Sequence, residues 1–359
     1  MAKTDASTGV IHTEYPRPKA LPANVTFDGL IRRNKRRSAL LMLGMTALLV
    51  ALGAAIGGLL GAMGGAGTAD HRGDAMSLWP SLLLGTAVAL VLAGIGCAWS
   101  WFSGSKAVLR MSGARRIEHK DDPQLFNVVE ELAIAAGTPL PEVYLIDDPS
   151  LNAFATGRDP QHAAVAITTG LRQHLSRDEL AGVMAHEIAH IRNYDVRLMM
   201  LMATMVGLIV FAADAFRRMV FYGALMGGRR GGMRSGGGGG RGGGQGAVIA
   251  IMFLIVLVLS ILAPIFAIMI RFAVSRQREY LADASAVELT RYPQGLIGAL
   301  EKLGGCRQTL QGANRATAHM FIVNPLKDAL KGQGHNLSSA FRTHPPLQDR
   351  IARLRALIH

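Results

Sequence analysis

The stretch "MAHEIAHI", residues 184–191, places two histidines and a glutamate in a segment that is otherwise apolar. His186 and His190 are four residues apart, so on a helix they share one face and can both reach one metal ion. Glu187 lies about one hundred degrees further round the helix, where it misses the ion but can reach a water bound to it. This HExxH arrangement predicts two zinc ligands and a general base.

The surrounding segment, "LSRDELAGVMAHEIAHIRNYD", is predicted to form one helix. Ser176 is a favourable N-cap, and Glu179 three residues later completes a capping box. A lone HExxH arises by chance in on the order of one per cent of chains with this composition. The alternative is a buried helix whose histidines bond to their neighbours, and that alternative predicts no third ligand elsewhere.

A candidate third ligand lies in "SRQREYLADASAV", residues 275–287. Catalytic zinc usually takes three protein ligands and keeps one position for water, and Glu279 is the candidate for the third. Asp283 is one helical turn later and could accept a proton from the far nitrogen of a zinc-bound imidazole. The alternative is a solvated charged face, given the nearby Arg276 and Arg278.

The composition predicts a membrane protein. Half of the 359 residues are hydrophobic, only 18% are charged, and the mean hydropathy is +0.27, which is too apolar for an ordinary soluble domain. Four apolar stretches are long enough to span a bilayer: residues 39–63, 78–102, 198–216 and 248–270. The third is the shortest and carries Asp214 near its end, so a buried core helix is its alternative. The net charge of +13 is explained by basic residues that flank the spans.

These stretches divide the chain into five parts. They are a basic cytoplasmic segment (1–37), a first membrane hairpin (38–102), a first catalytic half (103–197), a second hairpin (198–274) and a second catalytic half (275–359). Basic residues before the first span and after the second predict that both catalytic halves are cytoplasmic.

Two glycine patterns lie within the hairpins. The tract at residues 227–246, "GGRRGGMRSGGGGGRGGGQG", is predicted to be a disordered linker, although RGG sequences also occur in RNA-binding segments. In the first span, Gly53, Gly57, Gly61 and Gly65 recur every four residues and predict a face for close helix packing, with no partner named. The two cysteines, Cys97 and Cys306, are isolated and indicate neither a disulfide framework nor a cysteine zinc site.

"HEIAH" followed by "EYLAD" after an apolar hairpin resembles the HtpX-type membrane zinc metalloproteases, relatives of the CaaX prenyl proteases. The resemblance extends from about residue 103 to the end of the chain, and it includes "NAFATG" at 152–157 and "HPP" at 344–346 with Arg350 following. The resemblance implies that His186, His190 and Glu279 are the zinc ligands, that Glu187 is the general base, and that the Asp283 carboxylate supports a ligand. It also implies that Asn152 and Ala153 lie on an edge strand that pairs with the substrate, and that His344 stabilises the transition state.

The fold class expected is therefore a mainly α (α+β) integral membrane protein. Four membrane helices in two hairpins would accompany a zincin-like cytoplasmic domain with a small β-sheet, since residues 141–157 and 163–171 read as strand, loop and strand. The function expected is a zinc endopeptidase of the bacterial inner membrane, acting on membrane or misfolded polypeptides under stress, in contact with lipid and without nucleic acid. The alternatives are a prenyl-protein protease, which usually has more spans, and a non-catalytic chaperone or scaffold.

Overall fold

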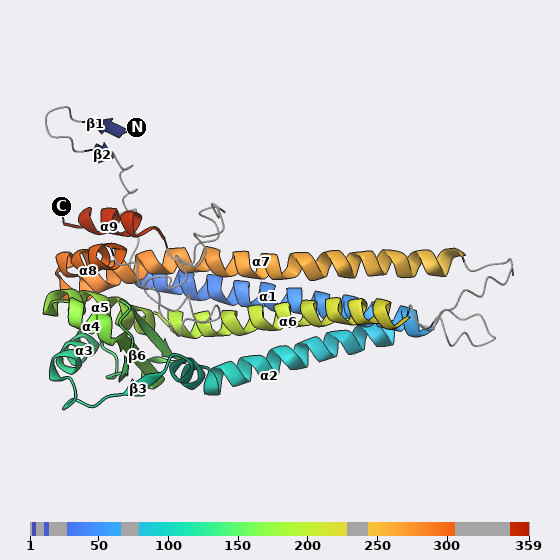
Figure 1. The fold of residues 1–359 in the computed structure, drawn as a ribbon, viewed down its shortest axis with the longest axis horizontal. Helices are drawn as coiled ribbons and strands as arrows, with labels where there is room; N and C mark the ends of the chain where they lie inside the picture. The colour runs from blue at the N-terminus through green and yellow to red at the C-terminus, as the bar shows by residue number, and fades with distance from the viewer. Residues whose placement is uncertain are drawn as a thin grey trace. The chain divides into compact units, whose positions relative to one another are not determined.

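The structure is a computed structural model of the chain and describes residues 2–4, 11–13, 27–65, 79–227, 243–305 and 345–358. It divides into two compact units, each built from separate parts of the sequence (Figure 1). The membrane unit comprises residues 35–106 and 197–274, and the polar unit comprises residues 1–34, 107–196 and 275–359.

The membrane unit contains parts of four long helices: α1 (Phe27–Gly65), α2 (Trp79–Met111), α6 (Asp195–Gly227) and α7 (Gly243–Thr290). Each carries a segment long and apolar enough to cross a membrane: Ala39–Ala62, Trp79–Met111, Asp195–Tyr222 and Ala250–Ile270. The four predicted spans are thus confirmed by length and composition. One apolar cluster joins all four helices and includes Met45, Ala89, Met205 and Ala267.

The glycine face of α1 packs against α2. A β-carbon built on Gly53 would lie 2.6 Å from Ala89 Cβ, and one built on Gly57 would lie 2.9 Å from Gly85 Cα. The predicted packing face is therefore confirmed at Gly53, Gly57 and Gly61, and its partner is the other helix of the same hairpin. Only residues without a side chain let two helix backbones approach this closely.

Two helices extend beyond the predicted spans into neighbouring segments. Helix α1 begins at Phe27, inside the segment taken as a basic lead-in, because its arginines, lysine and leucines favour helix and neither glycine nor proline interrupts residues 31–43. Helix α7 begins at Gly243, inside the tract taken as a linker, and continues without a break from its span to Thr290. Residues 228–242 lie outside the described residues, so the predicted disorder stays a prediction.

The polar unit is built on a four-stranded sheet of β3 (Ala114–Arg116), β4 (Glu142–Ile146), β6 (Ala163–Thr168) and β5 (Ala153–Gly157), in that spatial order. β4 and β6 are parallel, and the other neighbours are antiparallel. Strands β4, β5 and β6 confirm the predicted small sheet. Strand β3 was not predicted, because its three residues, "ARR", carry no apolar alternation. A separate short hairpin pairs β1 (Ala2–Thr4) with β2 (Ile11–Thr13).

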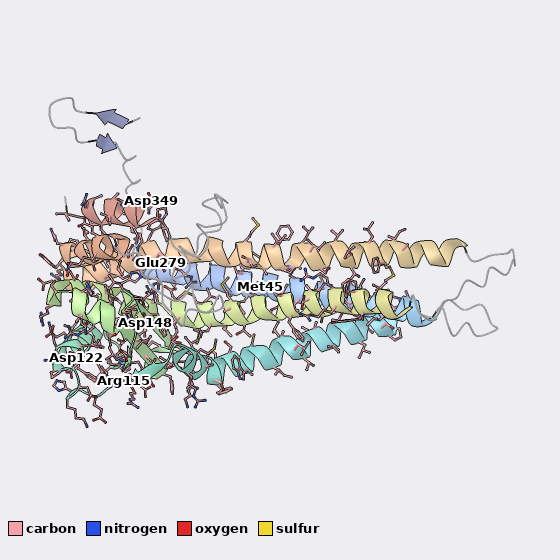
Figure 2. The ribbon with its side chains drawn as sticks, in the orientation of Figure 1. Met45, Arg115, Asp122, Asp148, Glu279 and Asp349 are labelled. Carbon is pink, nitrogen blue, oxygen red and sulfur yellow. The ribbon has the colours of Figure 1, made fainter. Side chains whose placement is uncertain are left out.

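The polar unit also contains the helices α3 (Pro123–Ala136), α4 (Thr169–His174), α5 (Arg177–Arg192), α8 (Pro293–Gly305) and α9 (Leu347–Arg355), with a 3-10 turn, η1, at Pro160–His162. Helix α5 is central and packs on α3, α8 and β5. A β-carbon on Gly182 would lie 2.8 Å from Leu296 Cα, so α5 and α8 touch at the backbone. Figure 2 labels Asp122, Asp148, Glu279 and Asp349 in the polar unit and Met45 on α1.

Candidate active site

Helix α5 begins where the sequence predicts. The Ser176 side chain accepts from the Glu179 N–H at 3.3 Å, and the Glu179 carboxylate accepts from the Ser176 N–H at 2.7 Å, which confirms the capping box. The second half of the helix is buried through Ile191, including its two histidines and Glu187. Polar groups held this deeply need partners, because an unpaired polar group costs free energy once it is removed from water.

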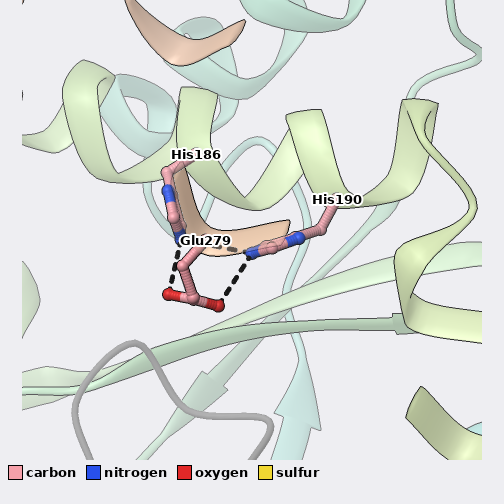
Figure 3. Close-up of side chains that lie close together, drawn as sticks. All are labelled: His186, His190 and Glu279. Atoms are coloured by element: carbon pink, nitrogen blue, oxygen red, sulfur yellow. Dashed lines mark hydrogen bonds and ion pairs between the residues drawn. The ribbon is translucent and has the colours of Figure 1, made fainter. Parts of the chain in front are cut away.

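Three side chains from two helices meet in one place. The Nε2 atoms of His186 and His190 are 3.2 Å apart, and they lie 3.7 and 3.5 Å from the two carboxylate oxygens of Glu279 on α7 (Figure 3). Among the described residues, this is the group of histidine and acidic side chains that could hold a metal ion. A tetrahedral ion with bonds of 2.0–2.1 Å separates adjacent ligand atoms by about 3.3 to 3.4 Å. The observed spacing therefore fits one such ion.

Two carboxylates fix the tautomers of the imidazoles. His186 Nδ1 lies 2.9 Å from Asp283 Oδ1, and His190 Nδ1 lies 3.1 Å from Asp195 Oδ2. Each Nδ1–H donates to its carboxylate, so both Nε2 lone pairs point toward the carboxylate of Glu279. Burial, with the positive charge of Arg350, lowers the pKa of His186 to about 4 and keeps that ring neutral, as a metal ligand must be. Three acceptors that face one point need a cation between them.

The balance of buried charges around these three side chains also favours a bound cation. Four carboxylates and two guanidinium groups are buried here, and each residue is at most 4% exposed. They are Glu187, Asp195, Glu279, Asp283, Arg278 and Arg350. With neutral histidines the site carries one excess negative charge when Glu187 is protonated and two when it is ionised, and a divalent ion would offset this charge. Buried charges are found where they are paired or coordinate a metal.

Arg350 of α9 holds Asp283. Its Nε and Nη2 lie 2.8 and 2.6 Å from the two oxygens of that carboxylate, and its Nη1 lies 3.4 Å from Glu279 Oε2. Burial would raise the pKa of Asp283, but Arg350 and His186 lower it below its ordinary value. Burial likewise opposes the charge on Arg350, but Asp283 keeps its pKa above the ordinary value. The pair therefore stays ionised in the core.

Glu187 lies beside the three ligand atoms and against the sheet. Its carboxylate accepts a hydrogen bond from the backbone N–H of Ala155 in β5. Burial and the charge of Glu279 raise its pKa to about 7, although His190 and the Ala155 hydrogen bond oppose the shift. A carboxylate with such a pKa can both take and release a proton near neutral pH.

The residues predicted to bind substrate lie at the same edge of the sheet. Asn152 directly precedes β5. Its carbonyl accepts from the Thr168 N–H, its own N–H donates to the Thr168 hydroxyl, and its side-chain oxygen accepts from the Ala153 N–H. Ala153 is the first residue of β5. His344 lies outside the described residues, and the described chain resumes at Pro345 before α9.

Sequence reasoning did not find the contacts of Asp195 and Arg350. Asp195 received no role, although it follows the motif closely at the start of an apolar span. Arg350 was noted only as a neighbour of "HPP". The alternative of a solvated charged face does not hold for Arg278, because it is buried and pairs with Asp195. The available signal for Asp195 was a carboxylate close after the HExxH motif at the start of an apolar span.

A family model for peptidase family M48 matches residues 119–358. The chain belongs to peptidase family M48. It is 42% identical over 326 residues to the protein named Protease HtpX homolog of Streptococcus uberis, covering 90% of this chain and 98% of that one. It is 44% identical over 274 residues to the same-named protein of Dictyoglomus turgidum, covering 76% and 82% of the two chains. The crystal structure of S. mikatae Ste24p matches with a TM-score of 0.45 and 21% identity, over 78% of this chain and 59% of that one.

The M48 chain is an HtpX-type membrane metalloprotease, as the resemblance predicted. The family implies a metal and polypeptide substrates, and the group of His186, His190 and Glu279 is compatible with that metal. The alternative of a non-catalytic scaffold is not favoured, and the prenyl-protein protease is not favoured either.

Proposed function

We propose that the metal is zinc, held by His186, His190 and Glu279, and that the enzyme cleaves membrane or misfolded proteins at the cytoplasmic face of the bacterial inner membrane, as quality control. Two imidazoles and one carboxylate form a ligand set typical of catalytic zinc. The observation that carries the proposal is the convergence of two fixed Nε2 lone pairs and a carboxylate at tetrahedral spacing.

A bound zinc ion would polarise the scissile carbonyl and lower the pKa of an attacking water. Glu187 would take the proton of that water and pass it to the leaving amine, since its carboxylate lies beside the ligands but outside their set. The Ala155 N–H orients the Glu187 carboxylate. His344 would donate a hydrogen bond to the oxyanion.

The edge of β5 supports a mode of substrate binding. Asn152 bonds to Thr168 on β6, while the Ala155 N–H points the other way, toward Glu187. Backbone groups alternate along an antiparallel strand, so Ala153 and Gly157 face the same side as Ala155, and the Ala153 N–H on that side donates to Asn152 Oδ1 in this structure. An extended peptide added to this edge would run past the proposed base. Asn152, Ala153 and Ala155 are buried, so peptide binding must uncover this edge.

The cleavage of a model membrane substrate by the purified protein tests this function. Activity should disappear on chelation and return with one equivalent of zinc per chain. A protein that binds substrate polypeptide but never cleaves it, with zinc present, would instead support the chaperone alternative.

The orientation needs a separate test. A cysteine placed at Ser235, probed in sealed cells with an impermeant thiol reagent, should be labelled from outside if the second hairpin spans. Labelling only after the membrane is opened would mean that the hairpin does not cross and that this part of the proposed topology is wrong.

A further inference from the structure

A second carboxylate–arginine pair lies behind His190. Asp195 is fully buried, and its Oδ2 lies 3.1 Å from His190 Nδ1. Its other oxygen, Oδ1, accepts from Nη1 of Arg278, which is itself buried. Arg278 directly precedes Glu279 on α7, so the pair joins the histidine on α5 to the helix that carries the carboxylate of the group.

His186 has the same arrangement from other parts of the chain. Its Nδ1 lies 2.9 Å from Asp283, and Arg350 holds that carboxylate with two nitrogens. Each imidazole therefore contacts one carboxylate through Nδ1, and each of these carboxylates pairs with one buried guanidinium. The same arrangement is therefore built twice from different parts of the chain. This repetition indicates that it serves a property that both imidazoles share, the direction of their Nε2 atoms.

The backbone between α5 and α6 makes the second pair possible. On a continuous helix, residues five apart point about 140° away from each other, so Asp195 could not reach His190. Helix α5 ends at Arg192, and Tyr194 adopts a left-handed conformation with a φ of 58°. This conformation is unfavourable for a bulky residue. It turns the chain so that Asp195, the first residue of α6, lies under the imidazole.

We propose that Asp195 and Arg278 are the positioning pair for His190. Asp195 accepts from Nδ1–H and so leaves Nε2 as the metal-binding nitrogen, while Arg278 donates to the other oxygen of Asp195 and fixes that carboxylate against the ring. The pair also ties the first residue of α6 to α7, so the direction of His190 depends on these two helices remaining in contact at this point. This inference rests on the metal site proposed above.

The competing explanation is an ordinary structural ion pair. It predicts that loss of the pair lowers stability but leaves the geometry and affinity of the metal site unchanged in the molecules that fold. The positioning role predicts a change in both. Cobalt substitution separates the two explanations, because visible d–d absorption reports the ligand field of a bound Co²⁺ ion and needs no turnover.

The test compares full-length protein in detergent with Asp195→Asn, Arg278→Gln and Asp195→Asn/Arg278→Gln. Affinity for Zn²⁺ is measured by competition with a chromophoric chelator, and the spectrum is measured with Co²⁺. Asp195→Asn should weaken the affinity roughly 10- to 100-fold, the usual effect of losing such a partner, and should shift the cobalt bands. Arg278→Gln should act in the same direction, and the double variant should lose less than the two single losses combined.

Asp122→Asn is the matched control. Asp122, the N-cap of α3, pairs with Arg172 of α4 at 2.6 Å in the same unit, so this variant breaks a partly buried ion pair outside the group of His186, His190 and Glu279. This variant should keep the parent affinity and spectrum. Folded variants with Asp195→Asn and Arg278→Gln that both match the parent would overturn the proposal.

If Arg278→Gln does not fold, Arg278→Lys takes its place, because lysine keeps the charge but lacks the planar guanidinium. Parent-like metal affinity of both Arg278→Lys and Asp195→Asn would likewise refute the positioning role. If the parent protein itself binds no metal, the proposed function fails and takes this inference with it. A different result is that the parent protein binds metal and His190→Ala loses that binding, while Asp195→Asn and Arg278→Gln change nothing. That result rejects the positioning role of the pair but leaves the proposed metal site standing.

Discussion

The backbone N–H of Ala155 donates a hydrogen bond to the buried carboxylate of Glu187, so the edge strand β5 and the helix α5 meet at a single side chain. This contact gives one carboxylate two neighbours with different chemistry. On one side are the three atoms that could hold a metal, and on the other is a strand edge to which a peptide could add. A general base for peptide hydrolysis must lie between these two partners.

Glu187→Gln should therefore abolish cleavage while leaving metal binding intact. The amide keeps the size of the side chain and can still accept from Ala155, but it cannot take a proton. We expect a loss of about 10²- to 10⁴-fold or more in kcat, with about one metal ion bound per chain as in the parent. Single-turnover cleavage beside metal analysis measures both. Retained activity would exclude Glu187 as the base.

Glu279→Gln should lose both metal and activity. The two imidazoles alone leave a site with one protein ligand fewer than catalytic zinc usually has. Glu288→Gln is a control on the same helix, since Glu288 is half exposed and pairs with Arg192 rather than with the histidines. If Glu279→Gln binds zinc as tightly as the parent while Glu288→Gln does too, the third ligand lies elsewhere.

Arg350→Gln should be strongly destabilising. It leaves Asp283 as a buried carboxylate without its two guanidinium bonds, and breaking a buried pair in this way costs about 3 to 5 kcal/mol. Arg355→Gln provides the comparison on the same helix, because Arg355 is mostly exposed and its pair with Glu301 is worth at most about 1 kcal/mol. Denaturant unfolding of the two variants in detergent measures the difference. Equally small losses of unfolding free energy in the two variants would show that Arg350 of α9 does not stabilise the site.

Asp122 should give the polar unit an acid-sensitive contribution to stability. Burial raises the pKa of its carboxyl, but hydrogen bonds from Arg172 and the Leu125 N–H lower it below its ordinary value overall. A lowered folded-state pKa means that the stabilisation is fully present above about pH 4 and is lost as the pH falls through the lowered value. The difference in unfolding free energy between the parent and Asp122→Asn should thus be about 1 kcal/mol at pH 7 and should shrink in acid. If the difference in unfolding free energy does not change with pH, the effect of Asp122→Asn arises from the shape of the side chain and not from its charge.

The sequence predicted local features well and long-range partners poorly. The capping box of α5, the strands and the four spans each depend on patterns within about 25 residues, and the structure contains all of them. Glu279 could be named as a candidate only together with the HExxH motif, because its own segment taken alone favours a solvated charged face. Asp195 and Arg278 are 83 residues apart, and their contact depends on one left-handed residue, Tyr194, that no periodicity announces. Burial of Arg278 could not be read from a span end, where charged residues are commonly solvated.

Helix packing in the first hairpin yields the last prediction. Gly57→Ala should destabilise the membrane unit, because the new β-carbon would lie 2.9 Å from Gly85 Cα and 3.1 Å from its backbone nitrogen, so α1 and α2 would have to separate. Overpacking of this kind typically costs about 1 to 3 kcal/mol. Gly94→Ala is the matched change on α2, where a β-carbon meets nothing within 4 Å, and it should be neutral or stabilise by up to about 1 kcal/mol because alanine favours helix over glycine. Thermal unfolding of both variants in one detergent measures the two effects. Equal changes would mean that the two helices do not touch along this face.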